Sequence, residues 1–412
     1  MIPYPFDSVE LIQSRKSLKR KLLADGSARI VKKIAVLGGS TANDIVNMLE
    51  LFLLDSGIEP VFYLSEYNRF WQDAVFSNAE LDEFKPDLVF IHTTTRNLDF
   101  PFDVRLTAGQ ADERIKSEYN RFQQMWEKLS ERFSCPIIQN NFEQPTSRIF
   151  GNRDFSDPRG LVRAVNRMNM LFADYAEGAK NFYIHDINWL SAQLGLDRWA
   201  DPLHWYMYKY ALSMEAVPVF AHSLAAIVKS IYGKNKKALV LDLDNTLWGG
   251  VVGDDGVNGL EIGQETPTGQ AFQEFQTYLG RLKAIGITLT VASKNDEDNA
   301  IAGLNHPDGV LKPDDFAIIK ANWNPKSQSI EEICAELNIL TDSVVFLDDN
   351  PAEREIVKGM LPTVFAPPMD GVENYIKTLD RAGCFEVTAL SDDDLKRNEM
   401  YKANIARATT AA

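Results

Sequence analysis

The feature that most limits the fold of this chain is the apolar run Leu239–Leu241, which ends in two carboxylates, Asp242 and Asp244. A run without polar residues predicts a strand buried on both faces, as in a parallel sheet that is covered by helices. Residues at the end of such a strand lie at the carboxyl edge of the sheet, where open α/β folds bind ligands. Because the chain turns after Asp242, we expect Asp244 to swing back over the same pocket, with Thr246 just beyond.

The same pattern recurs downstream, with polar residues where buried strands end or a helix begins. These are Ser293 after the run Ile287–Ala292, Lys326 behind Pro325 at the start of a helix to about Leu337, and Asp348 and Asp349 after the run Ser343–Leu347. Proline is favoured in the first turn of a helix. The sequence therefore predicts that an acid pair, a hydroxyl, a lysine and a second acid pair meet at one sheet edge.

Two carboxylates in one pocket can divide a reaction between them, one as nucleophile and the other as proton donor. The simpler alternative is an acidic strand end that binds water or a stray cation. Lys326 favours the catalytic interpretation, because lysine is not the charge that a helix N-terminus prefers. Lys320 is a rival to Lys326, but it ends a predicted strand without a helix behind it.

The order of these residues resembles the haloacid dehalogenase (HAD) superfamily of aspartate-nucleophile phosphatases, and most closely its subfamily IIIC, the FkbH-like proteins. Two segments, Leu247–Gly256 and Phe346–Glu355, look like FkbH-like signatures in particular. The resemblance covers roughly residues 236 to 405. It implies a phosphohydrolase with a HAD-like fold.

The resemblance also implies a role for each motif residue. Asp242 would form an aspartyl-phosphate, and Asp244 would act as the general acid and base. Thr246, Ser293 and Lys326 would bind the phosphate. The implied cofactor is Mg²⁺, held by Asp242, the main-chain carbonyl of Asp244, and Asp348 or Asp349.

The spacing of the motifs predicts a site without a cap domain. The interval from Asp242 to Ser293 is filled by a flap (Trp248–Gly263), a helix (Gly269–Ala284) and a strand. A cap needs tens of residues with a core of their own. We therefore expect an open site, which either a macromolecule or another domain of the chain would close.

The N-terminal half predicts a second doubly wound, parallel α/β sheet, because short β-type runs alternate with helical segments. The expected strands are Lys33–Leu37, Pro60–Leu64, Leu88–His92, Pro136–Gln139 and Phe182–His185, with helices at Ala42–Leu54 and Ala111–Phe133 and a last helix from about Leu212 to Tyr232. Gly233 marks the expected boundary. This gives a flavodoxin-like domain at 1–233, a capless HAD-like domain at 234–388 and a helix at 389–412, and both domains are Rossmann-like. FkbH-like chains often continue into an acyltransferase-like domain, which leaves open whether a further domain follows this helix.

The N-terminal half carries a second candidate site. Ser40 follows Gly38-Gly39 between a strand and a helix, Asn97 follows the third strand, and Asp201 and His204 have Asp-x-x-His spacing. This set resembles an SGNH hydrolase, although the usual Gly-Asp-Ser is replaced by Gly-Gly-Ser. In the alternative interpretation Ser40 is a helix N-cap and His204 packs among its aromatic neighbours. The other histidines are expected to be structural: His92, His185, His222 and His306.

Composition limits the partners of the chain. Hydrophobic residues make up 45% and charged residues 25%, as in soluble globular proteins. A net charge of -15 argues against nucleic acid as a partner, because binding to its backbone needs clustered Lys and Arg. No apolar run is long enough to span a membrane. The three cysteines show no disulfide or zinc spacing, which favours a reducing cytoplasm.

The motifs support hypotheses from different classes of function. The first is a Mg²⁺-dependent phosphatase acting on a phosphorylated small acid, or on a carrier-protein-linked intermediate of biosynthesis. FkbH-like proteins, as the family implies, load a glyceryl unit from 1,3-bisphosphoglycerate onto an acyl carrier protein. Such loading usually needs a thiol at the site. None of the three cysteines lies at a predicted strand end that faces the site: Cys135, Cys334 and Cys384. The second is an SGNH-type esterase or acyltransferase centred on Ser40. The third is an interaction scaffold with both sites decayed.

Overall fold

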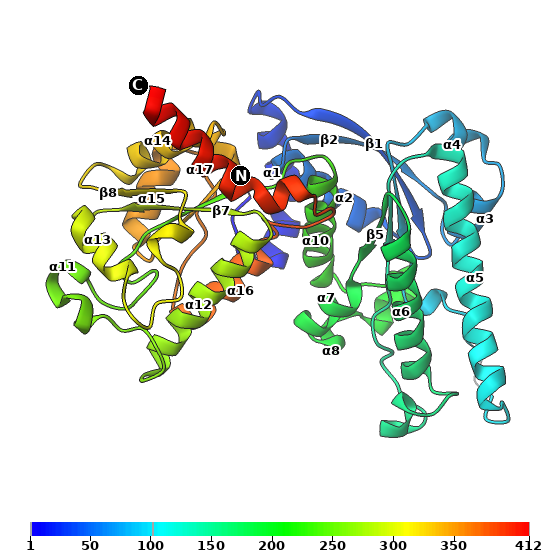
Figure 1. Cartoon of the computed structure of the whole chain (residues 1–412). Coiled ribbons are helices and arrows are strands. Elements are labelled where there is room, and N and C mark those ends of the chain that lie inside the picture. Colours follow the sequence, from blue (N-terminus) through cyan, green and yellow to red (C-terminus); the bar gives the residue numbers. More distant parts are fainter. Residues whose placement is uncertain (1, 101–102, 412) are drawn as a thin grey trace. The chain divides into compact units, whose positions relative to one another are not determined.

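The structure, a computed structural model, describes residues 2–100 and 103–411 and divides into two compact units (Figure 1). The N-terminal unit is formed by Phe6–Lys229 together with Ile2. The C-terminal unit is formed by residues 230–411 together with residues 3–5. None of the described helices is long and apolar enough to cross a membrane.

The N-terminal unit is built on five parallel strands in the order β2-β1-β3-β4-β5, which is the flavodoxin-like order. The strands are β1 (Ile30–Gly38), β2 (Ile58–Leu64), β3 (Leu88–His92), β4 (Ile137–Asn140) and β5 (Phe182–His185). All five predicted strands are confirmed. The largest difference is in β1, which begins three residues early because the pairing of Ile30 with Ile58 extends the strand beyond its apolar run.

Helices cover both faces of this sheet. They are α1 (Ser8–Ala24), α2 (Asn43–Asp55), α3 (Phe70–Val75), α4 (Ala79–Phe84), α5 (Ala108–Phe133), α6 (Leu161–Gly178), α7 (Ile187–Leu194), α8 (Leu196–Trp199), α9 (Pro202–Tyr208) and α10 (Ala216–Ile231). On one face, Trp126 of α5 is fully buried against Phe172 of α6 and Phe182 of β5, with ring centroids 4.7 and 4.8 Å away. On the other face, Phe220 of α10 packs on Phe90 of β3. The unit is therefore doubly wound, as predicted.

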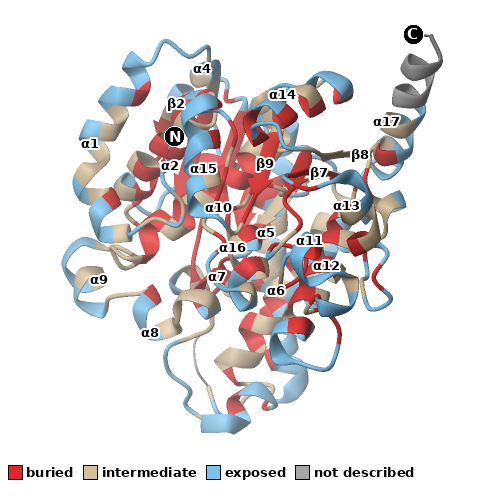
Figure 2. Cartoon of the chain, turned by 90° about the vertical axis from the view of Figure 1, so that its left-hand side faces the viewer, coloured by how far each residue is buried: buried red, intermediate tan, exposed pale blue. Residues whose placement is uncertain are grey.

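The C-terminal unit has four parallel strands in the order β8-β7-β6-β9. They are β6 (Ala238–Leu241), β7 (Thr288–Ser293), β8 (Ile318–Ala321) and β9 (Val344–Leu347). Alternate residues of a strand face opposite sides of the sheet. Leu239 and Leu241 accordingly belong to one core cluster, and Ala238 and Val240 to the other. Figure 2 shows buried residues concentrated in β7 and β9, whereas β8 is mostly of intermediate burial.

Helices flank both sides of the second sheet as well. They are α11 (Val252–Asp255), α12 (Pro267–Ala284), α13 (Glu297–Leu304), α14 (Lys326–Leu337), α15 (Pro351–Met360), α16 (Tyr375–Arg381) and α17 (Asp392–Ala411). The cluster with Leu239 takes residues from α12, α13 and α16, and the cluster with Val240 takes residues from α14 and α15. Between Asp242 and Ser293 the described chain forms α11, a 3-10 turn, α12 and β7, with no inserted domain. The C-terminal unit is therefore capless.

The last helix, α17, packs on the turn between α12 and β7. Its start is capped reciprocally, because Asp394 N donates to Ser391 Oγ at 3.1 Å and Ser391 N donates to Asp394 Oδ2 at 3.0 Å. Gly286 has φ +94°, and a Cβ there would lie 2.3 Å from the carbonyl oxygen of Asp394. Asn398 Nδ2 donates to the carbonyl of Ile287. A glycine at 286 therefore lets the helix approach the turn closely.

Candidate active site

The first element of the site is the turn that follows β6. Asp242 N donates to the carbonyl of Leu347, so Asp242 continues the ladder between β6 and β9 by one residue. Asn245 then adopts a left-handed conformation (φ 54°), which asparagine tolerates better than most residues. The turn closes with a hydrogen bond from Thr246 N to the carbonyl of Leu243. This geometry brings Asp242 and Asp244 out of the strand in different directions.

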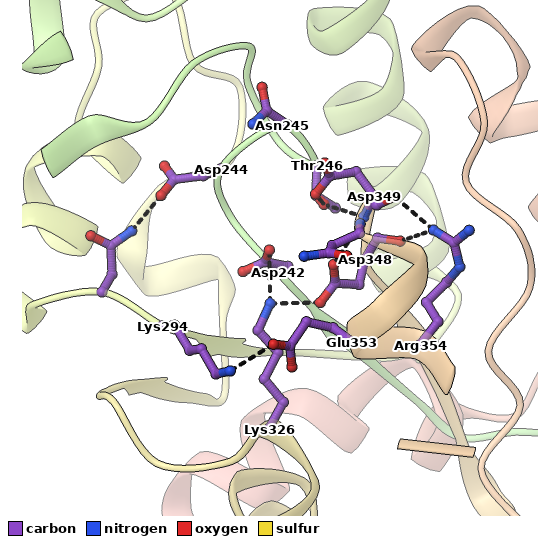
Figure 3. A network of polar contacts seen from close by, with 12 residues as sticks. Asp242, Asp244, Asn245, Thr246, Lys294, Lys326, Asp348, Asp349, Glu353 and Arg354 are labelled. Atoms are coloured by element: carbon purple, nitrogen blue, oxygen red, sulfur yellow. Dashed lines mark hydrogen bonds and ion pairs between the residues drawn. The ribbon is translucent and has the colours of Figure 1, made fainter. Parts of the chain in front are cut away.

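Asp242 lies in a buried ion-pair cluster (Figure 3). Lys326 Nζ is 2.9 Å from Asp242 Oδ2 and 2.6 Å from Asp348 Oδ2. Lys326 is the first residue of α14, and its side chain is 5% exposed. The rival lysine, Lys320, instead pairs with Glu332 and Glu336 on the surface of α14. The structure thus places Lys326 where the sequence predicted it.

The second acid pair follows β9 and is held by two further residues. Asp349 N donates to Thr246 Oγ1 at 3.2 Å, and that hydroxyl lies 3.5 Å from Asp349 Oδ1. Arg354 of α15 is buried, and its Nη1 donates to the carbonyls of Asp348 (2.7 Å) and Asp349 (2.8 Å). The Thr246 hydroxyl, which is predicted to bind phosphate, contacts the backbone N and the carboxylate of Asp349 in this structure, and its role towards phosphate stays a prediction.

The electrostatics of the cluster favour a bound cation. Burial alone would lower the pKa of Lys326, but the charges of Asp242 and Asp348 outweigh it and raise that pKa, so the lysine stays positive. Burial and the neighbouring Asp242 raise the pKa values of Asp348 and Asp349. One lysine thus balances only one of three carboxylates. Asp242, Asp348 and Asp349 each offer one oxygen, and these oxygens lie within 4.8 Å of one another.

Asp244 and Ser293 complete the residues predicted for this edge. Ser293 is buried at the carboxyl end of β7, next to β6. Asp244 lies outside the three-carboxylate group, and burial is the main cause of its raised pKa. Its carboxylate accepts hydrogen bonds from Trp248, Val252 and Asn295. We did not predict Arg354 or Asn295 as site residues, although Arg354 falls within a signature segment named from the sequence.

The N-terminal unit pairs Ser40 with a different histidine from the one predicted. Ser40 Oγ lies 2.9 Å from His92 Nε2, and both residues are buried. Asn140 Nδ2 donates to the Thr93 carbonyl and also contacts His92 Nδ1 at 2.9 Å. His92 Nδ1 is therefore the acceptor, and its Nε2 carries the proton that is donated to Ser40. Burial lowers the pKa of His92 to about 4, so the ring is neutral. In this arrangement His92 cannot take a proton from Ser40.

The remaining residues of the second candidate site have local partners. Asn97 Nδ2 donates to the Gly39 carbonyl at 2.9 Å. Asp201 is the N-cap of α9, and its Oδ2 lies 3.4 Å from His204 Nδ1. In the described part of the chain, neither Asp201 nor His204 bonds to Ser40. The N-cap of α2 is Ala42, so Ser40 does not have the capping role either. A Ser40 triad remains a prediction, and these hydrogen bonds disfavour it.

Comparisons with known proteins support the resemblance inferred from the sequence. Residues 33–229 match the family model described as FkbH, N-terminal domain. The crystal structure of the N-terminal part of the protein BF1531 from Bacteroides fragilis, containing a phosphatase domain complexed with Mg, is 29% identical and has a TM-score of 0.84. That match covers 91% of this chain and 99% of the other. The alignment therefore extends over both units.

Two weaker structural matches each cover only part of this chain. A predicted HAD-like family hydrolase from Porphyromonas gingivalis is 16% identical, with a TM-score of 0.25 over 35% of this chain and 97% of that one. The C-terminal catalytic domain of peptidoglycan O-acetyltransferase A from Streptococcus pneumoniae is 13% identical, with a TM-score of 0.28 over 50% and 97%. Neither score is high enough to carry an argument. No curated protein sequence matches the chain.

Replacing Lys326 by Met tests the role of the lysine as counter-charge. The substitution leaves Asp242 and Asp348 buried without a cation, so we expect it to lower the free energy of unfolding by about 3–5 kcal/mol. The loss should be smaller at pH 5 than at pH 8, because protonation of the carboxylates relieves their repulsion. Urea unfolding in magnesium-free buffer measures both effects.

Lys320→Met is the matched control, since Lys320 pairs with acids of α14 that are more than a third exposed. Its cost should be at most about 1 kcal/mol. Equal losses for the two variants, or a loss for Lys326→Met that does not depend on pH, would contradict the counter-charge role.

Proposed function

We propose that this chain, whose residues 33–229 match the FkbH N-terminal domain, is a phosphohydrolase of HAD subfamily IIIC that works through an aspartyl-phosphate on Asp242. The observation that carries the proposal is the buried cluster in which Lys326 holds Asp242 beside Asp348, with Asp349 close by. The likeness to a phosphatase-containing protein over nearly the whole of both chains supports it.

The residues of the site divide a phosphoryl transfer into two steps. Asp242 attacks phosphorus, while the leaving oxygen departs with a proton from Asp244. Water then attacks the same phosphorus, Asp244 takes its proton, and the carboxylate of Asp242 is released with inorganic phosphate. Lys326 forms an ion pair with the Asp242 carboxylate before the attack and offsets the charge of the phosphoryl oxygens, and Ser293 bonds one of them.

Mg²⁺ fits the acidic cluster. Asp242, Asp348 and Asp349 would hold it, with the main-chain carbonyl of Asp244, because carboxylate and carbonyl oxygens are the ligands this hard cation prefers. When bound, it supplies positive charge between the carboxylates and the phosphoryl oxygens. The magnesium in the BF1531 crystal structure supports the choice of metal. The Thr246 and Arg354 contacts would keep Asp349 in place for this role.

The substrate we propose is a phosphorylated small acid or a carrier-protein-linked intermediate of biosynthesis. A site without a cap domain suits a substrate with a long arm. Loading of a glyceryl unit from 1,3-bisphosphoglycerate onto an acyl carrier protein is the family alternative, and it needs a thiol. Cys334 and Cys384 are buried in the two core clusters of the C-terminal unit, and burial raises the pKa of Cys334 to about 11. The cysteines therefore favour a plain phosphatase step.

The nucleophile assignment is tested with an aryl phosphate such as 4-nitrophenyl phosphate. Asp242→Asn should lower kcat by about a thousandfold or more, because an amide cannot attack phosphorus. Ser40→Ala should leave kcat within about twofold, because Ser40 belongs to the other unit and is not part of the acidic cluster. If Ser40→Ala alone abolished turnover, the chemistry would belong to the N-terminal unit.

The metal assignment is tested by thermal denaturation with increasing Mg²⁺. A ligand that binds the folded state at 100 times its Kd adds about 2.7 kcal/mol of stability, so the wild-type Tm should rise. Asp349→Asn should lose most of this shift, and the exposed control Asp314→Asn, outside the cluster, should keep it. A wild-type Tm that ignores Mg²⁺, or an undiminished shift in Asp349→Asn, would remove the metal from the proposal.

A further inference from the structure

Asp244 is held by three N–H donors. Trp248 Nε1 and Val252 N each donate to Oδ1 at 3.0 Å, and Asn295 Nδ2 donates to Oδ2 at 2.8 Å. Figure 3 shows the Asp244 carboxylate directed away from Asp242. Both oxygens of Asp244 are thus fixed by hydrogen bonds from the protein.

The three donors come from two different parts of the unit. Trp248 and Val252 belong to the flap, the segment 248–263 that follows Asp244 in the chain. Asn295 follows β7 and is 4% exposed, so it belongs to the framework that carries Ser293. The hydrogen bonds from the flap and the hydrogen bond from Asn295 therefore meet at the Asp244 carboxylate, which connects the flap to the end of β7.

The packing of Trp248 strengthens this connection. Trp248 is buried, and a Cβ on Gly303 of α13 would lie 2.8 Å from its ring. Only a glycine at 303 lets the indole sit this close to α13. Because α13 begins two residues after Asn295, the same framework segment holds both the indole and the amide that bind Asp244.

The position of Asp244 suits proton transfer to a leaving group. In a displacement at phosphorus the attacking and leaving oxygens lie roughly in line, on opposite sides of the phosphoryl group. The acid must therefore stand apart from the nucleophile. Asp244 meets this requirement, because it lies outside the group formed by Asp242, Asp348 and Asp349 and faces away from it.

We infer that Asn295 is a positioning residue for the proposed acid Asp244. The Trp248 indole is the second side chain that donates a hydrogen bond to Asp244 and helps to hold it. This inference rests on the proposed phosphatase function. A misplaced acid weakens only the part of catalysis that depends on protonating the leaving oxygen. That part is large for an alkyl phosphate and small for 4-nitrophenyl phosphate, whose phenolate departs without a proton.

The experiment compares kcat for 2-phenylethyl phosphate and 4-nitrophenyl phosphate in the full chain. Asn295→Ala should lower kcat for the alkyl ester about tenfold and for the aryl ester less than about threefold, as expected for loss of one hydrogen bond to a charged group. Trp248→Phe, which keeps a smaller aromatic ring but lacks the N–H, should show the same selectivity. Asn305→Ala is the matched control, because that exposed amide donates within its own helix.

A double variant separates positioning from a structural role. In an Asp244→Asn background, adding Asn295→Ala should change neither rate further, because residues that act as a unit are not additive. Equal losses on both esters, or a full additional loss in the double variant, would overturn the inference. The proposed function itself would fail on a different result: wild type turning over neither ester, or Asp242→Asn keeping full activity.

Discussion

The candidate site depends on one buried ion-pair cluster, in which Lys326 bridges Asp242 and Asp348. Burying these charges is costly, and it is tolerated only because each has a partner at hydrogen-bond distance. The cluster joins the ends of β6 and β9 to the first residue of α14, so it fixes three elements of the sheet edge at once. It also places a positive charge beside Asp242 in a pocket that retains excess negative charge. A site of this kind can bind a divalent cation and present a carboxylate nucleophile without rearranging its framework.

Asp244 lies two residues from Asp242, yet the structure gives it a different environment. Asp242 faces a lysine, whereas Asp244 is surrounded by amide and indole N–H groups. Two carboxylates in different environments can take different roles in one reaction. The N-terminal unit also carries polar residues at the carboxyl edge of its sheet, but there Ser40 accepts a hydrogen bond from a neutral His92. The two units therefore have similar folds, but the residues at the carboxyl edges of their sheets support different chemistry.

The sequence was enough to predict both parallel sheets and the position of Asp242, Lys326 and Asp348, because each lies where an apolar run ends or a helix begins. Contacts between side chains from distant segments could not be predicted from apolar runs and helix starts. Asn295 reaches Asp244, and Thr246 reaches Asp349, only after the strands have paired in register. The contact between Ser40 and His92 was missed for the same reason: His92 looked like an ordinary core residue in its strand, and only the pairing of β1 with β3 brings it to the serine.

In the proposed mechanism Asp242 carries the phosphoryl group during turnover. Its most direct test is to quench the enzyme during turnover of an aryl phosphate, reduce the acyl phosphate with borohydride, and identify the modified residue by mass spectrometry of peptides. We expect that Asp242 alone is converted to homoserine, and that Asp242→Asn gives no converted peptide. Conversion at another carboxylate, or phosphate release with Asp242 unmodified at every quench time, would contradict it.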